Sequence, residues 1–252
     1  MTRPDPSHAP LIGITLDVRV EADQATSPRT YHSGTGYGEA VTAAGGVPLW
    51  LGHDLDALPR LLSLCDGFIL TGGGDPDMQA FGEANHPAAR VIDPRRQAFE
   101  CAMLDALDTP EHAATPLLGV CLGMQLIALR AGGRLDQYMP DTMGDAAAAH
   151  ARFVSHRVTL RGDAPMLSDA DASCAVISSH RQRVIEPGGL AVVAVADDGT
   201  IEAVWDPARP WRLGVQWHAE RSRDLDHPLG WGLIRRLVRA AARKREATPG
   251  SA

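Results

Sequence analysis

The stretch Pro116-Leu117-Leu118-Gly119-Val120-Cys121-Leu122-Gly123-Met124-Gln125 decides the fold prediction for this chain. An apolar run that suits a buried strand ends at Val120, and helix-forming residues begin at Leu122. A cysteine flanked by glycines at such a junction has the form of a strand-to-helix elbow, which exposes a nucleophile above the sheet edge at a helix N-terminus. An arbitrary cysteine is more often a small buried core residue, but this surrounding string favours a catalytic interpretation of Cys121.

Strand and helix patterns alternate on both sides of this elbow. Repeated strand-helix units predict a parallel sheet that helices cover on both faces. After Gly133 the pattern changes to shorter strand-like runs, and an amphipathic helix closes the chain. The predicted strands are 11–16, 47–51, 67–70, 117–120, 154–160, 175–178, 190–196, 201–205 and 213–216, and the predicted helices are 37–44, 55–64, 95–107, 122–131 and 229–238.

A second motif, Leu213-Gly214-Val215-Gln216-Trp217-His218-Ala219-Glu220, places a strand directly before a histidine and an acid. On an extended segment His218 and Glu220 point the same way, so the carboxylate can hold one imidazole nitrogen while the other faces a nucleophile. Metal ligation by the pair is the weaker alternative because no third ligand lies at a useful spacing, and we expect no metal site. Most other histidines lie among polar or loop residues and are predicted to be surface groups: His32, His53, His86, His112, His150, His156 and His227.

The composition excludes several classes of protein. The 252 residues carry a formal net charge of -7, and the basic residues are spread out except for a late cluster, which argues against a nucleic-acid surface. No run of about 18 apolar residues and no apolar signal core occur, so we expect a cytoplasmic enzyme without membrane contact. We predict one domain over residues 10–240, disordered tails at 1–9 and 241–252, and no cofactor. The widely spaced cysteines are predicted to be free thiols: Cys65, Cys101, Cys121 and Cys174.

The two motifs together resemble the class I glutamine amidotransferase family, and more closely its γ-glutamyl-γ-aminobutyrate hydrolase branch, the peptidase C26 type. The resemblance extends over most of the chain. It implies a flavodoxin-like α/β fold: a central, mostly parallel sheet with helices on both faces and a smaller C-terminal β-rich part. Further matching segments are YGEAV at 37–41, AGGVP at 44–48, LTGGGDPD at 70–77, GGRLDQ at 132–137, SSHRQ at 178–182 and ADDGTIEA at 196–203.

The resemblance also implies roles for individual residues. The backbone N–H groups of Gly73 and Leu122 would form the oxyanion hole beside a Cys121, His218 and Glu220 triad. The candidate substrate-binding residues are Gln125, Ser179, His180 and Gln182. The chain departs from the hydrolase branch at three positions, where Leu122 replaces arginine, Ala219 replaces proline and Gln97 replaces aspartate.

The predicted function is cysteine-dependent hydrolysis of a γ-glutamyl amide, such as γ-glutamyl-GABA, to glutamate and an amine through a γ-glutamyl thioester. The resemblance connects this reaction to polyamine catabolism. Two alternatives stay open: a glutaminase subunit that delivers ammonia to a separate synthase, which Leu122 favours, and a non-catalytic binding homologue. The sequence does not decide whether the chain forms a homodimer.

Overall fold

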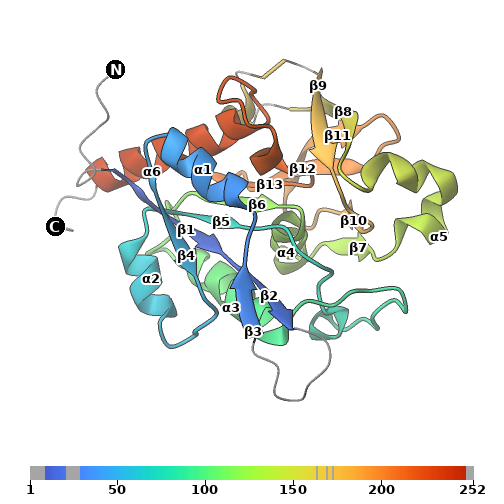
Figure 1. Cartoon of the computed structure of the whole chain (residues 1–252), viewed down its shortest axis with the longest axis horizontal. Helices are drawn as coiled ribbons and strands as arrows, with labels where there is room; N and C mark the ends of the chain where they lie inside the picture. Colours follow the sequence, from blue (N-terminus) through green and yellow to red (C-terminus); the bar gives the residue numbers. More distant parts are fainter. Residues whose placement is uncertain (1–8, 21–28, 163, 169, 172, 248–252) are drawn as a thin grey trace.

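The computed structural model describes residues 9–20, 29–162, 164–168, 170–171 and 173–247. Within these residues, the largest sheet has nine strands in the order β4-β1-β5-β6-β13-β12-β11-β8-β9 (Figure 1). The first five are parallel: β4 (Val47–Leu51), β1 (Leu11–Thr15), β5 (Gly67–Leu70), β6 (Leu117–Val120) and β13 (Arg212–Val215). The rest of the sheet is antiparallel: β12 (Ile201–Trp205), β11 (Ala191–Ala196), β8 (Val154–Leu160) and β9 (Ser173–Ser178).

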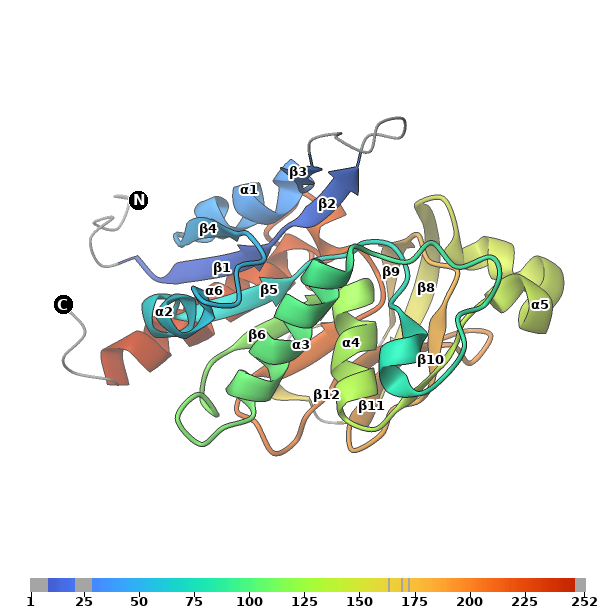
Figure 2. The same cartoon turned by 90° about the horizontal axis from the view of Figure 1, so that it is seen from below.

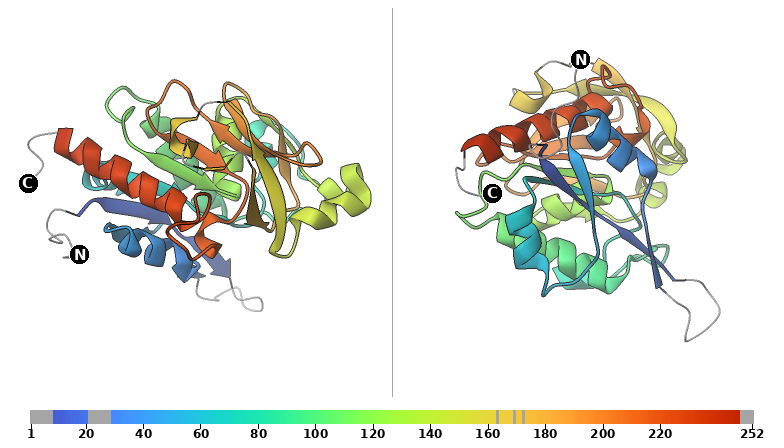
Figure 3. Two further views of the ribbon diagram at one scale, coloured as in Figure 1. Left: turned by 90° about the horizontal axis from the view of Figure 1, so that it is seen from above. Right: turned by 60° about the vertical axis from the view of Figure 1, so that its left-hand side comes forward.

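Helices cover both faces of the parallel part (Figure 2). Helices α2 (Leu58–Leu64), α3 (Pro94–Leu107) and α4 (Leu122–Arg130) pack on one face, and α1 (Thr35–Ala43) lies beside α6 (Trp231–Ala247) on the other (Figure 3). Successive strand residues point to opposite faces. In β5, for example, Phe68 and Leu70 join the core under α3 and α4, whereas Ile69 joins the core under α1 and α6. The strands are buried on both faces, which explains why they are continuous apolar runs in the sequence.

Smaller elements complete the fold. Two short ribbons pair β2 (Asp17–Val20) with β3 (Arg29–His32) and β7 (Arg134–Asp136) with β10 (Arg183–Glu186). Helix α5 (Met139–Met143) extends beyond the antiparallel part (Figure 1). The 3-10 helices are η2 (Met78–Phe81), η3 (Gly144–His150), η4 (Pro165–Leu167) and η5 (Ala219–Arg221). The predicted class I amidotransferase-like α/β fold with a β-rich C-terminal part is confirmed.

The prediction of a disordered tail from residue 241 is wrong as far as residue 247. Helix α6 continues to Ala247 because its apolar stripe does not end at Val238: Ala241, one turn further on, is fully buried against the sheet. In addition, the Arg245 guanidinium donates a hydrogen bond to the Ala9 carbonyl at 3.1 Å. The predicted tails at 1–8 and 248–252 lie outside the described residues.

No helix in the described part of the chain is long and apolar enough to cross a membrane.

Candidate active site

Cys121 lies at the junction of β6 and α4, in a backbone conformation that few residues adopt. Its φ of 52° and ψ of -104° differ from both strand and helix geometry. The flanking glycines are sterically required. A Cβ atom on Gly119 would lie 2.6 Å from the Gly123 backbone, and one on Gly123 would lie 2.5 Å from the Leu70 carbonyl oxygen. The turn therefore brings strand and helix together tightly and presents the Cys121 side chain at the carboxyl edge of the sheet.

His218 and Glu220 follow β13, the strand next to β6 in the sheet. The Glu220 carboxylate accepts a hydrogen bond from His218 Nδ1 at 2.8 Å, which leaves Nε2 for Cys121. Burial opposes protonation of this imidazole, but its hydrogen bonds with Cys121 and Glu220 raise the pKa of His218 to about 10. A charged imidazole beside a cysteine sulfur favours the thiolate, the form that acts as a nucleophile.

A glycine loop after β5 approaches the same three residues. A Cβ atom on Gly72 would lie 3.0 Å from His218 Cε1 and 3.5 Å from Cys121 Cβ. The Gly72 backbone N–H donates to the Tyr37 hydroxyl at 3.1 Å, so it is not free to bind an oxyanion. Gly73, the next residue, lines the cavity beside Cys121. The geometry thus favours Gly73 over Gly72 as an oxyanion donor, as predicted from the sequence.

Arg96 fixes the glycine loop from behind. Its fully buried guanidinium donates to the carbonyl oxygens of Thr71 at 2.8 Å and Gly72 at 3.2 Å. Ion pairs to Asp17 at 2.9 Å and Glu100 at 3.0 Å balance its charge. Because these contacts occupy the loop carbonyls, the loop is held in one position relative to Cys121.

Leu122 is the first residue of α4, so its backbone N–H has no partner within the helix. The helix dipole adds partial positive charge at this end. With the Gly73 N–H, this group would give the two donors that a tetrahedral oxyanion needs, and these roles stay a prediction. The structure therefore places both predicted oxyanion residues next to the predicted nucleophile.

Cys121 opens into a cavity of about 400 Å³. The walls come from the glycine loop, from α4 and from two segments of the C-terminal part, residues 151–152 and 179–182. All four predicted substrate-binding residues line this cavity: Gln125, Ser179, His180 and Gln182. The structure thus gathers residues from positions 73 to 182 of the sequence around one cavity.

Comparisons with known proteins agree with this geometry. Residues 10–220 match the model of the peptidase C26 family. The chain belongs to the peptidase C26 family. It is 34% identical over 224 residues to a predicted glutamine amidotransferase of Mycobacterium tuberculosis, covering 84% of this chain and 70% of that protein.

Two further comparisons bear on the family and on the fold. The chain is 30% identical over 202 residues to the gamma-glutamyl-gamma-aminobutyrate hydrolase PuuD of Escherichia coli, covering 73% of this chain and 76% of PuuD. The crystal structure of a glutamine amidotransferase from Thermotoga maritima superposes with a TM-score of 0.63 at 13% identity, covering 93% of this chain and 99% of the other. Family membership identifies this chain as an amide hydrolase-type protein.

The predicted substrate-binding residues differ in whether their side-chain polar atoms already have hydrogen-bond partners within the protein. The Gln125 amide donates to the Gln182 carbonyl at 3.3 Å and the Gln216 side chain at 3.2 Å. Among the described residues, both side-chain polar atoms of Gln182 are buried without a hydrogen-bond partner, so this amide is available to a ligand. His180 Nδ1 donates to the Gln182 carbonyl at 2.9 Å, and its Nε2 faces Glu202. Direct substrate contact by these side chains stays a prediction, and His180 is the least suited to it.

The sequence analysis gave no role to Tyr37 or Arg96, which anchor the glycine loop. Both lie in segments that carried the family resemblance or its departures, and this was the only signal available for them. Gln97, one of the departures, also acts on this loop: its side-chain amide accepts from the Asp77 N–H at 2.7 Å and donates to the Asp77 carbonyl at 3.0 Å. An amide can do both, whereas an ionised aspartate can only accept.

The prediction that the remaining histidines are surface groups is wrong for three of them. His53 and His150 are buried, and the His156 side chain is only 11% exposed. The reason is that each finds a polar partner in the interior. His53 Nε2 contacts the Leu16 carbonyl at 2.9 Å, and His150 and His156 gather around Glu202.

Proposed function

We propose that the chain hydrolyses a γ-glutamyl amide with Cys121 as nucleophile, His218 as acid and base, and Glu220 as the group that orients His218. The thiolate attacks the γ-carbonyl carbon, and the N–H groups of Gly73 and Leu122 stabilise the oxyanion, each contributing about 3 kcal/mol in related chemistry. Protonated His218 then gives its proton to the departing amine. His218 next takes a proton from water, and the resulting hydroxide attacks the γ-glutamyl thioester, which releases glutamate and restores the Cys121 thiolate beside protonated His218.

One observation carries this proposal: Cys121, His218 and Glu220 are joined in a hydrogen-bonded line, with Nδ1 of His218 bonded to Glu220 at 2.8 Å, and Cys121 lines a cavity. A structural cysteine has no need of a charged imidazole at its sulfur. The strained φ of 52° at Cys121 supports the same interpretation, because backbone strain of this kind persists mainly at functional sites.

The charges of the cavity favour a γ-glutamyl amide whose amine half carries a carboxylate. Arg90, Arg152 and Arg181 line the cavity with Asp75, which pairs with Arg181 at 3.3 Å, so the lining carries a net positive charge. A γ-glutamyl derivative of an amino acid such as GABA has two carboxylates for these arginines and one ammonium group for Asp75. Glutamine has only one carboxylate, so it would leave part of this positive surface unmatched. Hydrolysis of γ-glutamyl-GABA would serve polyamine catabolism in the cytoplasm.

The direct test is glutamate release from γ-glutamyl-GABA and, separately, from glutamine, with Cys121→Ala as the inactive control. We expect faster release from γ-glutamyl-GABA and none above background from the variant. An Arg152→Ala variant should raise KM for γ-glutamyl-GABA about tenfold, as expected for a lost charge-assisted contact, and raise KM for glutamine less. Arg157→Ala, at an exposed arginine on β8, is the matched control. Wild-type turnover by Cys121→Ala would refute the mechanism.

A second function, a glutaminase that supplies ammonia to a separate synthase, is favoured by Leu122 and by the amidotransferase names of the relatives from Mycobacterium tuberculosis and Thermotoga maritima. This function predicts glutamine hydrolysis that increases when a synthase is added. If neither substrate releases glutamate with or without cell extract, the non-catalytic alternative is left.

A further inference from the structure

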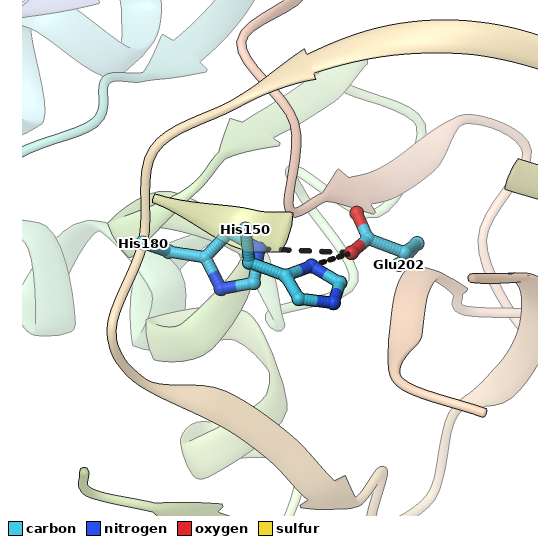
Figure 4. A group of neighbouring side chains, drawn as sticks. All are labelled: His150, His180 and Glu202. Atoms are coloured by element: carbon cyan, nitrogen blue, oxygen red, sulfur yellow. Dashed lines mark ion pairs between the residues drawn. The ribbon is translucent and has the colours of Figure 1, made fainter. Parts of the chain in front are cut away.

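A cluster of buried histidines behind the cavity wall has no part in the proposed mechanism. His150 ends η3, His180 follows β9, and Glu202 lies in β12. Figure 4 shows both imidazole rings turned toward the Glu202 carboxylate. Glu202 Oε1 lies 3.1 Å from His150 Nδ1 and 3.6 Å from His180 Nε2. These three side chains are at most 1% exposed.

The polar atoms that face one another in this cluster lie at ion-pair distance, 3.1 and 3.6 Å, without the geometry of a hydrogen bond. His150 Nδ1, His180 Nε2 and both carboxylate oxygens of Glu202 are buried without a hydrogen-bond partner in the part of the chain that the structure describes. A buried carboxylate is strongly unfavourable unless something supplies a proton or a positive charge. The cluster therefore needs a cation, either a protonated imidazole or a metal ion.

The outer nitrogens of both rings are held as a metal site requires. His150 Nε2 contacts Asp198 Oδ2 at 2.8 Å, and His180 Nδ1 contacts the Gln182 carbonyl at 2.9 Å. A carboxylate and a carbonyl can only accept, so both outer nitrogens carry hydrogens. In their neutral forms, both rings then direct the lone pair of the inner nitrogen at Glu202. Metal-binding histidines are usually held in this way, with the other N–H donating to a carboxylate or a backbone carbonyl.

We propose that His150 Nδ1, His180 Nε2 and the Glu202 carboxylate bind a divalent transition-metal ion with the ligand preferences of Zn²⁺. Bonds of about 2.0–2.1 Å in a tetrahedron place ligand atoms about 3.3 Å apart. The two distances from Glu202 Oε1, 3.1 and 3.6 Å, lie on either side of that value, and the three ligand atoms all lie within 4.8 Å of one another. The fourth position would be taken by water or by His156, whose Nε2 lies 3.6 Å from Glu202 Oε1 and contacts Ser178 Oγ at 2.8 Å.

The site would connect three segments that form or support the cavity wall. The His180 backbone N–H already donates to the His150 carbonyl at 2.8 Å. Ala151 and Arg152 follow His150 directly, and Arg181 and Gln182 follow His180; all four line the cavity. An ion bound here would hold this wall from behind, so its role is structural and its ligands differ from the Cys121 triad.

The experiment measures metal binding by the untagged full-length protein after dialysis against EDTA. We expect one equivalent of Zn²⁺ by elemental analysis after re-addition and gel filtration, a higher Tm in its presence, and the visible absorption bands of a four-coordinate ion with Co²⁺. His150→Gln should weaken binding at least tenfold. His112→Gln, at a histidine outside the cluster, is the matched control, and Cys121→Ala tests whether the triad is the binding site instead.

Two results would overturn the proposal. The first is no Zn²⁺ or Co²⁺ binding by the wild-type protein at micromolar concentrations, which would leave a protonated imidazole as the cation in the cluster. The second is binding that survives His150→Gln and disappears in Cys121→Ala. If His150→Gln does not fold, NMR of the Co²⁺-loaded wild-type protein locates the ion. We expect the ion to broaden the imidazole signals of His150 and His180 more than those of His218. The reverse pattern would place the ion at the triad.

Discussion

The charge state of His218 is the most informative quantity to measure, because the proposed chemistry depends on it. Burial alone would lower the pKa of this imidazole below 6.5, yet Cys121 and Glu220 raise it to about 10. A hydrogen bond to a charged group contributes about 1.5–3 kcal/mol, which corresponds to about 1–2 in pKa. We therefore expect Cys121→Ala to lower the pKa of His218 to about 8–9. The double variant Cys121→Ala/Glu220→Gln, which keeps the burial and loses both partners, should have a His218 pKa that is lower still.

The assay is a pH titration of the ¹⁵N-labelled protein followed through long-range imidazole correlations. The His218 signals are identified by their loss in His218→Gln. Cys101→Ala, which removes a thiol elsewhere in the chain, is the matched control and should leave the titration unchanged. A wild-type His218 that titrates near the ordinary histidine value of about 6.5 would refute the reasoning, and so would a Cys121→Ala variant with an unaltered midpoint.

Stability provides a second measurement in Cys121→Ala, where no thiol titrates at the site. The pKa of His218 is still raised above its unfolded value there, so the folded state binds the extra proton. Its contribution to the free energy of unfolding is fully present below about pH 6.5 and is lost as the pH rises through about 8–9. The free energy of unfolding of this variant, measured with urea, should therefore fall with rising pH in that window. The free energy of unfolding of Cys121→Ala/His218→Gln should lack this decrease.

Three further predictions follow from the geometry. Iodoacetamide should alkylate Cys121 much faster than Cys65 at pH 7, because burial raises the pKa of the Cys65 thiol to about 12. Peptide mass spectrometry measures both rates, and equal rates would contradict an activated nucleophile. Tyr37→Phe removes the acceptor of the Gly72 N–H, so kcat should fall about tenfold with little change in KM. Steady-state kinetics with a raised KM and an unchanged kcat would contradict a loop-positioning role. Gly123→Ala places a methyl group 2.5 Å from a β5 carbonyl and should lower the free energy of unfolding by about 1–3 kcal/mol. An unchanged midpoint of urea unfolding would show that the elbow can accommodate this methyl group.

The elbow and the strand-helix order could be predicted from the sequence because their signals are local. The glycines on either side of Cys121 and the apolar runs before it are adjacent in the chain, and the structure places strand, turn and helix where the pattern indicates. The short ribbons β2–β3 and β7–β10 were not predicted. Each strand has only three or four residues in which charged or polar side chains interrupt the apolar ones, so they lack the apolar runs that marked the other strands.

The cavity charges and the histidine cluster could not be predicted for a different reason. His150, His180 and Glu202 are separated by about twenty to thirty residues each, at no spacing that a metal motif uses, and each looks like a loop or strand residue on its own. Only the antiparallel pairing of β8, β9, β11 and β12 brings their segments together. Arg152 and Arg181 lie in the same two segments and face the cavity for the same reason.

The histidine cluster shares the segment 179–182 with the cavity wall, whereas the Cys121 triad lies on other elements. The effects of the cluster and of the triad can therefore be separated by experiment. The segment from Ser179 to Gln182 presents Gln182 to the cavity and directs His180 Nε2 toward Glu202. The triad residues, in contrast, follow β6 and β13 in the parallel part of the sheet, and the glycine loop follows β5. Loss of Cys121 should therefore abolish turnover and leave the wall intact, because no cluster residue depends on the sulfur. Loss of the cluster's cation should loosen the wall and raise KM while Cys121 stays reactive toward iodoacetamide, because the side-chain partners of His218 are Cys121 and Glu220, not the cluster.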